Sequence, residues 1–276
     1  MILDGKMVSD IILNDIKNEV SNMDNKPKLA IIYIGNDESS NIYINNKIKA
    51  CDKVGILYQL YHLDNPSMDE VSILINKLNN DSNVSGIIIE SPIPSNLDYN
   101  YLCNLIKSSK DVDGFTKDNV YNNYLGNDSI IPCTVLGIMK LLEYYNIDVD
   151  GANVVIIGRS NIVGKPLVNT MINNNATVTI CHSHTKDLKN ITNKADILIS
   201  AIGESNYINS DYVKEGAVVI DVGISRNNNY ICGDVNYDDV KEKVSYITPV
   251  PGGVGPMTIA MLLNNIVDVS KMVNNG

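Results

Sequence analysis

The stretch VVIIGRSNIVGKPL, residues 154–167, passes from an apolar, β-branched run through a glycine turn into a helical pattern. This order is typical of nucleotide-binding α/β domains, in which backbone N–H groups and the positive end of the helix dipole hold a phosphate. Five residues separate Gly158 from Gly164, so the stretch is not a GxGxxG fingerprint. Pro166 follows Lys165 where a Walker loop needs Ser or Thr for magnesium, which argues against magnesium-nucleotide hydrolysis. A purely structural glycine turn is the alternative.

The next predicted strand indicates which dinucleotide would bind. Enzymes for the unphosphorylated cofactor usually hold the ribose with an acidic residue about 20 residues further on. Here ATVTICHSHT, residues 176–185, contains no Asp or Glu and offers Ser183 between two histidines, while Arg159 lies in the glycine turn. A hydroxyl and a guanidinium suit a ribose phosphate, so we expect NADP. Cys181 with the two histidines leaves a metal site as a weaker alternative. Because no carboxylate or second cluster completes its coordination shell, we expect no metal.

Short apolar runs alternate with helical patterns along the chain. The expected strands are 28–34, 56–61, 84–90, 153–157, 176–180, 196–200 and 217–222. Continuous apolar strands separated by helices indicate parallel sheets that are covered on both faces. An amphipathic helix at 134–146 could bridge the first three strands and the last four. We therefore expect two α/β domains with a cleft between them, the second a Rossmann-like parallel-sheet domain that binds NADP.

The composition narrows the class of protein. The 276 residues are 44% hydrophobic and 20% charged, which suits one large or two ordinary soluble domains. The net charge of −10 and the lack of a Lys/Arg-rich run argue against binding to nucleic acid or anionic lipid. Charged residues interrupt the apolar windows of the N-terminus, and no apolar run is long enough to cross a membrane. The 5 cysteines are scattered without CxxC spacing, as expected of free thiols in the cytoplasm.

A possible catalytic pair lies in SSNIYINNKIKA, which begins at Ser39. Tyr43 and Lys47 are four residues apart, so a helix would place both side chains on one face. Ser39 or Ser40 is expected to cap the start of this helix, and Gly55 to end it. Pairs with this spacing are common on solvated helix faces, so helix geometry alone favours an ordinary exposed pair.

Four motifs occur together and in order: this Tyr–Lys pair, KDVDGF at 110–115, the glycine turn, and ITPVPGGVGPMT at 247–258. In this combination the sequence resembles the bifunctional methylenetetrahydrofolate dehydrogenase/methenyltetrahydrofolate cyclohydrolase family. The resemblance runs from LDGK at 3–6 to the last helix. The glycine-proline segment is the most distinctive of the four motifs.

The resemblance implies two reactions in one cleft. A hydride passes from methylenetetrahydrofolate to NADP, and water then opens the methenyl product to 10-formyltetrahydrofolate. It also implies a cytoplasmic homodimer in one-carbon metabolism. The folate-binding catalytic domain would comprise residues 1–138 and 255–276, and the NADP-binding domain residues 139–254.

The resemblance assigns roles to individual side chains. Lys47 matches the catalytic lysine of the cyclohydrolase step, Tyr43 the tyrosine that packs along the folate, and Asp113 the aspartate that holds the pterin. A carboxylate suits that last role because it accepts two hydrogen bonds, from the exocyclic amine and the adjacent ring N–H. The structural alternative for Asp113 is a turn aspartate before Gly114. We expect the neighbouring Asp111 to be structural.

The remaining assigned positions are largely glycines. By resemblance, Pro251, Gly252 and Gly253 lie near the folate and the nicotinamide, although Pro and Gly also mark ordinary turns. The residues expected to bind NADP are Gly158, Arg159, Ser160, Ile162, Gly164, Ser183 and Gly203. Gly203 is included because it follows a predicted strand, where doubly wound sheets bind dinucleotides.

The chain departs from the family pattern at IESPIP, residues 89–94, where the family reads VQLPLP. Glu90 thus replaces a glutamine that hydrogen-bonds the catalytic lysine as a neutral partner. A glutamate could instead form an ion pair with Lys47 and stabilise its charged form. A dehydrogenase with weak or absent cyclohydrolase activity is therefore one alternative. A nucleotide-binding regulator without catalysis is the alternative from another class.

Overall fold

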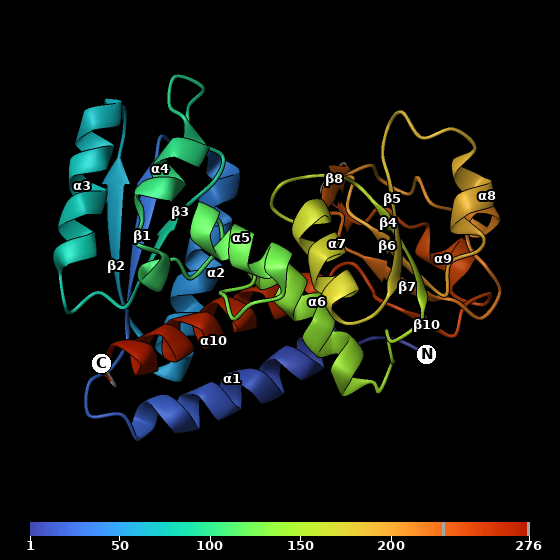
Figure 1. Cartoon of the computed structure of the whole chain (residues 1–276), viewed down its shortest axis with the longest axis horizontal. Coiled ribbons are helices and arrows are strands. Elements are labelled where there is room, and N and C mark those ends of the chain that lie inside the picture. Colours follow the sequence, from blue (N-terminus) through green and yellow to red (C-terminus); the bar gives the residue numbers. More distant parts are fainter. Residues whose placement is uncertain (228–229, 275–276) are drawn as a thin grey trace. The chain divides into compact units, whose positions relative to one another are not determined.

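A computed structural model describes residues 1–227 and 230–274 (Figure 1). The described chain divides into two compact units. The three-stranded unit contains residues 10–122, 127–133 and the chain from 259 onward, and the five-stranded unit contains residues 1–9, 123–126 and 134–258. Among the described residues, no helix combines the length and the apolar character needed to cross a membrane.

The three-stranded unit has the sheet order β2–β1–β3, and both strand pairs are parallel. Its strands are β1 (Lys28–Ile34), β2 (Leu57–Leu63) and β3 (Gly86–Ile89). Alternate residues of β1 pack with α3 and α4 in one core, and because side chains alternate across a strand, the other buried residues of β1 face the opposite side. The associated helical segments are α1 (Gly5–Ser21), α2 (Glu38–Val54), α3 (Met68–Asn80), α4 (Tyr99–Leu105), η1 (Ser108–Lys110), α5 (Lys117–Leu125) and α10 (Val254–Asn274).

The start of α2 corrects one expectation. Asp37 is the N-cap, rather than Ser39 or Ser40, and its carboxylate accepts a hydrogen bond from the Ser40 N–H at 2.9 Å. A charged acceptor ahead of the serines satisfies the first free N–H groups, so the helix begins before them. The predicted end is confirmed: Gly55 has φ +82° and donates its N–H to the Cys51 carbonyl at 2.9 Å.

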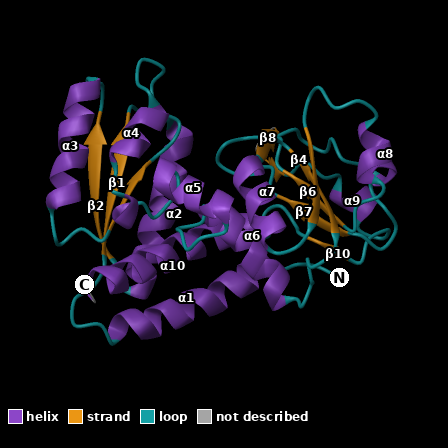
Figure 2. Ribbon diagram, viewed as in Figure 1, coloured by secondary structure: helices purple, strands orange, loops and turns teal. Residues whose placement is uncertain are grey.

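The five-stranded unit has the parallel sheet order β10–β7–β6–β4–β5 (Figure 2). These strands are β4 (Asn153–Ile157), β5 (Thr177–Cys181), β6 (Ile197–Ser200), β7 (Val218–Asp221) and β10 (Tyr246–Ile247). Counted from β4, the order is 2-1-3-4-5, a doubly wound arrangement whose strand order reverses between β4 and β6. In such sheets the ligand binds beyond the carboxyl ends of the strands at that reversal point.

Helices cover both faces of this sheet. Figure 2 shows the strands between α7 on one side and α8 with α9 on the other. The helices and 3₁₀ turn are α6 (Cys133–Tyr144), α7 (Gly164–Asn173), α8 (Leu188–Thr192), η2 (Ser210–Tyr212) and α9 (Tyr237–Val240), and β8 (Ser225–Asn227) pairs antiparallel with β9 (Tyr230–Cys232). The core between sheet and α8–α9 is built from apolar residues of β4, β6 and β7.

The expected domain boundaries differ from the compact units at their ends. The first nine residues belong to the five-stranded unit, because Leu3 N–H donates to the Ile247 carbonyl and Lys6 N–H to the Gly252 carbonyl, both at 2.8 Å. Residues 134–138 and 255–258 belong to it as well. Residues 275 and 276 of the expected catalytic domain lie outside the described residues. The functional assignment of the two expected domains stays a prediction.

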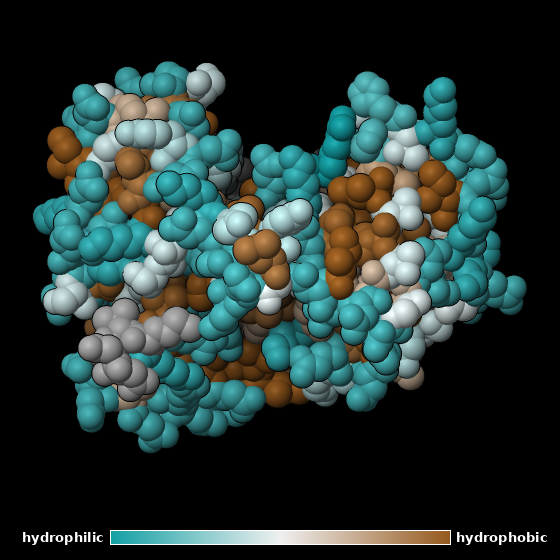
Figure 3. Space-filling model, in the orientation of Figure 1, coloured by the Kyte–Doolittle hydropathy of each residue, from teal (hydrophilic) through white to brown (hydrophobic). Residues whose placement is uncertain are grey.

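Exposed apolar side chains gather on the five-stranded unit. Figure 3 shows them over α7 and β5. Ile172 and Ile180 belong to these elements, and Tyr124 and Leu125 at the end of α5 are exposed in the same unit. An exposed apolar patch of this kind is a candidate contact surface.

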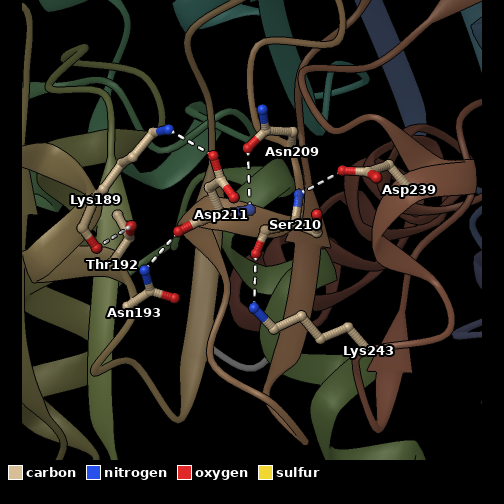
Figure 4. Close-up of polar contacts among 8 residues, drawn as sticks. All are labelled: Lys189, Thr192, Asn193, Asn209, Ser210, Asp211, Asp239 and Lys243. Carbon is tan, nitrogen blue, oxygen red and sulfur yellow. Dashed lines mark hydrogen bonds and ion pairs between the residues drawn. The ribbon is translucent and has the colours of Figure 1, made fainter.

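Hydrogen bonds and an ion pair connect the helical segments α8, η2 and α9 of the same unit (Figure 4). The N–H of Ser210 donates to Asp239 Oδ2 at 2.6 Å, and its carbonyl accepts from Lys243 Nζ at 2.8 Å. Lys189 of α8 pairs with Asp211 at 2.7 Å. The network therefore links α8, η2 and the region of α9.

Candidate functional site

The first candidate cluster lies in the three-stranded unit and centres on Lys47. Helix α2 carries this lysine, and Glu90 is the residue directly after β3. Lys47 Nζ lies 2.6 Å from Glu90 Oε2, and the side chains are only 18% and 6% exposed. The expected ion pair is therefore present, and it is largely buried.

Burial and neighbouring charges shift the pKa values of Lys47 and Asp113. Burial lowers the pKa of the Lys47 ammonium, but the attraction of Glu90 and Asp113 outweighs it, and the net pKa is raised. Burial raises the pKa of Asp113 to about 6, while Lys47 pulls it down and the charges of Asp111 and Glu90 push it up. The cluster thus places a charged ammonium near a carboxyl group that titrates close to neutrality.

The turn that carries Asp113 is held by its neighbour Asp111. The buried Asp111 carboxylate accepts hydrogen bonds from the N–H groups of Gly114 and Thr116, both at 2.8 Å. Gly114 has φ +74°, and a Cβ there would lie 2.5 Å from the Ile130 carbonyl. The structural role expected of Asp111 is confirmed, and the turn that it organises leaves the Asp113 side chain partly exposed.

Sequence reasoning missed three residues of this cluster. The Cys133 thiol lies 3.7 Å from Asp113 Oδ1 and donates to the Val112 carbonyl at 3.3 Å. Asn265 of α10 donates to the same carbonyl at 3.0 Å. Tyr99 lies close enough to Asp113 for the carboxylate charge to act on its phenol, whose pKa is raised mainly by burial. No local pattern marks these residues, because folding brings them together from distant segments.

Tyr43 lies one helical turn before Lys47, as the spacing predicts, and its side chain is 42% exposed. Its hydroxyl has no hydrogen-bond partner among the residues that the structure describes. The side chain is therefore accessible to a ligand, and its contact with folate stays a prediction.

The second candidate site is the glycine turn at the reversal point of the five-stranded sheet. Gly158 has φ +116°, and a Cβ there would lie 2.3 Å from the Ala201 carbonyl, at the end of β6. A Cβ on Gly164 would lie 2.2 Å from the Gly158 carbonyl. Both glycines are therefore required by close backbone packing, and this packing joins the loops after β4 and β6.

Ser160 changes the expectation for the start of α7. Its Oγ accepts hydrogen bonds from the N–H groups of Val163 at 3.2 Å and Gly164 at 3.3 Å. These two N–H groups, expected to hold a phosphate, are thus already paired within the turn. The hydroxyl hydrogen of Ser160 remains able to donate to a phosphate oxygen, and the side chain is exposed.

The residues expected to bind a ribose phosphate follow two adjacent strands. Gly158 N–H donates to the Cys181 carbonyl at 2.9 Å, so the turns after β4 and β5 lie at one sheet edge. Arg159 and Ser183 are both exposed in those turns, and the Arg159 guanidinium has no ion-pair partner in the described part of the chain. The other expected cofactor residues, Ile162 and Gly203, are also exposed. Within residues 1–227 and 230–274, no group of three or more His, Cys, Asp and Glu side chains could hold a metal ion.

The segment with Pro251 belongs to the five-stranded unit. Pro251 is exposed, and Gly252 has φ +108°. Gly253 is buried, and a Cβ there would lie 2.6 Å from the Pro249 carbonyl. Packing thus accounts for Gly253, and the contact of this segment with folate and nicotinamide stays a prediction.

Comparison with known proteins identifies the family of this chain. Residues 3–113 match the model of the tetrahydrofolate dehydrogenase/cyclohydrolase catalytic domain, and residues 132–274 match that of its NAD(P)-binding domain. The bifunctional protein FolD of Agathobacter rectalis is 50% identical over 275 residues, which cover 98% of this chain and 99% of the relative.

Two solved structures that resemble this chain belong to the same family. The crystal structure of the bifunctional enzyme FolD, methylenetetrahydrofolate dehydrogenase/cyclohydrolase, from Campylobacter jejuni has a TM-score of 0.97 and 46% identity, with 99% of each chain covered. The dehydrogenase-cyclohydrolase FolD of Trypanosoma brucei, complexed with NADP cofactor and inhibitor, has a TM-score of 0.95 and 31% identity, with 100% of this chain and 99% of that chain covered. This chain therefore belongs to the tetrahydrofolate dehydrogenase/cyclohydrolase family.

Proposed function

We propose that this protein oxidises methylenetetrahydrofolate to methenyltetrahydrofolate with NADP and hydrolyses the product to 10-formyltetrahydrofolate. The observation that carries the proposal is the buried Lys47–Glu90 pair at 2.6 Å, with Asp113 beside it, in a chain with the sequence of this family. A nucleotide-binding regulator would not need a charged cluster of this kind.

Asp113 would hold the pterin. Its carboxylate can accept one hydrogen bond from the exocyclic amine and one from the adjacent ring N–H. With the pKa raised to about 6, the group is mostly ionised at neutral pH and can accept both. Tyr43, exposed one turn before Lys47, would pack along the folate.

Lys47 would act on the methenyl carbon and its attacking water. Its ammonium can donate a proton or polarise a developing negative charge, and it acts as a base only when deprotonated. Because Glu90 favours the charged form, this lysine suits the role of proton donor better than that of base.

NADP, when bound, accepts the hydride from the methylene carbon of the folate. The exposed hydroxyls of Ser160 and Ser183 and the exposed Arg159 guanidinium suit phosphate groups, and the glycines allow close approach of the backbone. The residues that would hold it are Gly158, Arg159, Ser160, Ile162, Gly164, Ser183 and Gly203.

A second candidate function rests on Glu90. An ion pair that keeps Lys47 protonated would slow any step that needs the neutral amine. On this view the protein is a dehydrogenase whose cyclohydrolase activity is weak or absent.

The protein would work as a homodimer in the cytoplasm. The exposed apolar residues over α7 and β5 offer a face for a second copy, and all five cysteines are free, as in a reducing compartment. Replacing Ile172 by glutamate should shift the protein to monomer in analytical ultracentrifugation, whereas Ile73→Glu on α3, also exposed, should not. A dimeric Ile172→Glu variant would contradict this choice of interface.

The main test is Lys47→Met with both reactions followed by absorbance. We expect hydrolysis of methenyltetrahydrofolate to fall by about 10²- to 10⁴-fold, the usual contribution of a positioned proton-transfer group. Hydride transfer to NADP should fall less. Lys49→Met, an exposed lysine on the same helix, is the matched control and should keep both rates within about twofold of wild type.

Two results would overturn the proposal. Wild-type protein that turns over no methylenetetrahydrofolate with NADP or NAD would exclude the dehydrogenase. A Lys47→Met variant with the hydrolysis rate of Lys49→Met would exclude the proposed role of the lysine.

A further inference from the structure

Asp234, between β9 and α9, is fully buried and bonds to the end of β6. Its Oδ2 accepts from the Ser200 hydroxyl at 2.9 Å and from the Ile202 N–H at 2.8 Å. Its Oδ1 accepts from the Glu204 N–H at 2.9 Å. One carboxylate therefore binds both ends of the segment 202–204.

A second buried carboxylate fixes Asp234 itself. Asp221, at the end of β7, is 3% exposed. Its Oδ1 accepts from the N–H groups of Gly223 and Asp234, both at 3.0 Å, and its Oδ2 accepts from the Val235 N–H at 2.8 Å. The backbone that carries Asp234 is thus anchored to the sheet.

Two glycines make room for this arrangement. A Cβ on Gly223 would lie 2.0 Å from Asp234 Oδ1, and a Cβ on Gly233 would lie 1.9 Å from Asp221 Oδ2. Neither carboxylate has a Lys, Arg or His partner among the described residues. Burying two carboxylates without a cation is costly, and apolar side chains could fill the same space at lower cost. Their hydrogen bonds, however, specify the backbone conformation of the segment that they hold.

That segment lies at the reversal point of the sheet. The Ala201 carbonyl packs against Gly158 of the glycine turn. Gly203 is exposed, with φ +72°, and its carbonyl accepts from Ser225 Oγ at 2.8 Å. The backbone of residues 201–204 is thus held by the packing against Gly158 and by the hydrogen bond from Ser225, while Gly203 is exposed and accessible to a ligand.

We propose that Asp234 is a positioning residue for the dinucleotide: it holds residues 202–204 in the conformation that receives the cofactor, and Asp221 holds Asp234. This inference rests on the proposed function. It adds a residue that does not touch the cofactor but acts through the backbone that does.

The test is Asp234→Asn in the full-length protein, with NADPH binding measured by fluorescence titration. An amide has one acceptor and one donor end, so in either orientation its NH₂ faces an N–H of residue 202 or 204. We expect NADPH to bind about tenfold more weakly, the effect of one lost hydrogen bond to a charged group. The KM for the folate in the hydrolysis reaction should stay within about twofold, because that reaction requires no cofactor.

Val240→Ala is the matched control for lost stability. This buried valine packs in the core between the five-stranded sheet and α8–α9, but it makes no hydrogen bond to residues 201–204. It should lower the Tm and leave the Kd for NADPH unchanged. Should Asp234→Asn fail to fold, Ser200→Ala removes one of the three bonds to Asp234 and should weaken NADPH binding about threefold.

The outcomes separate the two proposals. Wild-type protein that does not bind NADPH would overturn the proposed function, and this inference with it. Wild-type binding together with an unchanged Kd in Asp234→Asn, or in Ser200→Ala if that variant has to be used, would overturn the inference alone. The inference would also be overturned if Val240→Ala lowered the affinity for NADPH as much as Asp234→Asn does when the two variants have the same Tm.

Discussion

The two units present chemically different sites. In the three-stranded unit the site consists of side-chain charges: the Lys47 ammonium lies 2.6 Å from Glu90, with Asp113 beside it. In the five-stranded unit the site is shaped by close backbone packing, with Gly158 and Gly164 so near to other carbonyls that a Cβ has no room. The first site should therefore be sensitive to changes of charge at constant shape, and the second to the addition of a single carbon.

Of the substitutions that test this difference between the two sites, Gly164→Ala should have the largest effect. The new Cβ would meet the Gly158 carbonyl at 2.2 Å, so the turn must move and NADP affinity should fall by about 100-fold or more. Hydrolysis of methenyltetrahydrofolate should change by less than about threefold, since Lys47 and Asp113 lie in the other unit. Titration with NADPH and the hydrolysis assay measure the two effects.

A control glycine sharpens this test. Gly151 has φ +72°, but no atom lies within 4 Å of the place that a Cβ would take, so Gly151→Ala carries only the backbone cost of about 1–2 kcal/mol. Its NADPH affinity should match that of wild type. Equal losses of both activities in Gly164→Ala would show that the two sites are not separable.

The next effect is expected from Asp113→Asn, which changes charge at constant shape. Loss of a charge-assisted hydrogen bond to the pterin should lower kcat/KM for methylenetetrahydrofolate by about 10- to 100-fold. NADPH affinity should be unchanged. Asp118→Asn, an exposed aspartate in the first turn of α5, is the control and should behave as wild type. An equal loss of NADPH affinity would break the separation of the two sites.

The pH dependence follows from the same group. The pKa of Asp113 is raised to about 6, so the carboxylate that accepts two hydrogen bonds is the dominant form above pH 6 and is lost as the pH falls below it. We expect kcat/KM to fall about tenfold per pH unit below that point. Asp113→Asn should lose this limb of the profile. A variant that keeps the limb would assign it to another group.

The smallest effect is expected from Glu90→Gln, which restores the residue usual in the family. Removing the charge leaves burial as the main influence on Lys47 and lowers the pKa of its ammonium. The ratio of cyclohydrolase to dehydrogenase activity should rise about threefold, as measured by the paired absorbance assays. Glu143→Gln breaks an exposed pair with Lys140 at 2.8 Å and should leave the ratio unchanged. An unchanged ratio in Glu90→Gln would reject weak cyclohydrolase activity caused by this glutamate.

Local sequence patterns determined much of the fold. The strands at 28–34 and 153–157 have the predicted ends, because each is a continuous apolar run bounded by turn residues. The other predicted strands exist with ends shifted by up to two residues, and the glycine turn joins β4 to α7 as expected. Strands β8, β9 and β10 have only two or three residues each, too short for a periodic signal.

The charged pair is also predictable from the sequence. The family resemblance predicts that the residue at position 90 contacts Lys47, and the replacement of the usual glutamine by Glu90 predicts an ion pair. The structure places the two charged groups in contact. Resemblance could not show how Asp113 is supported, because Cys133 contacts its carboxylate and Asn265 bonds to the neighbouring Val112 carbonyl from segments that lie elsewhere in the chain.

Tertiary structure alone decided the rest. A sequence does not state which strand lies beside which, so the reversal point between β4 and β6 appears only in the folded sheet. The capping of α2 by Asp37, the pairing of Ser160 with the start of α7 and the burial of Asp221 beside Asp234 all depend on which donors packing leaves unsatisfied. Periodic patterns encode which residues are buried, whereas the partner of a buried polar group is fixed only when distant segments meet.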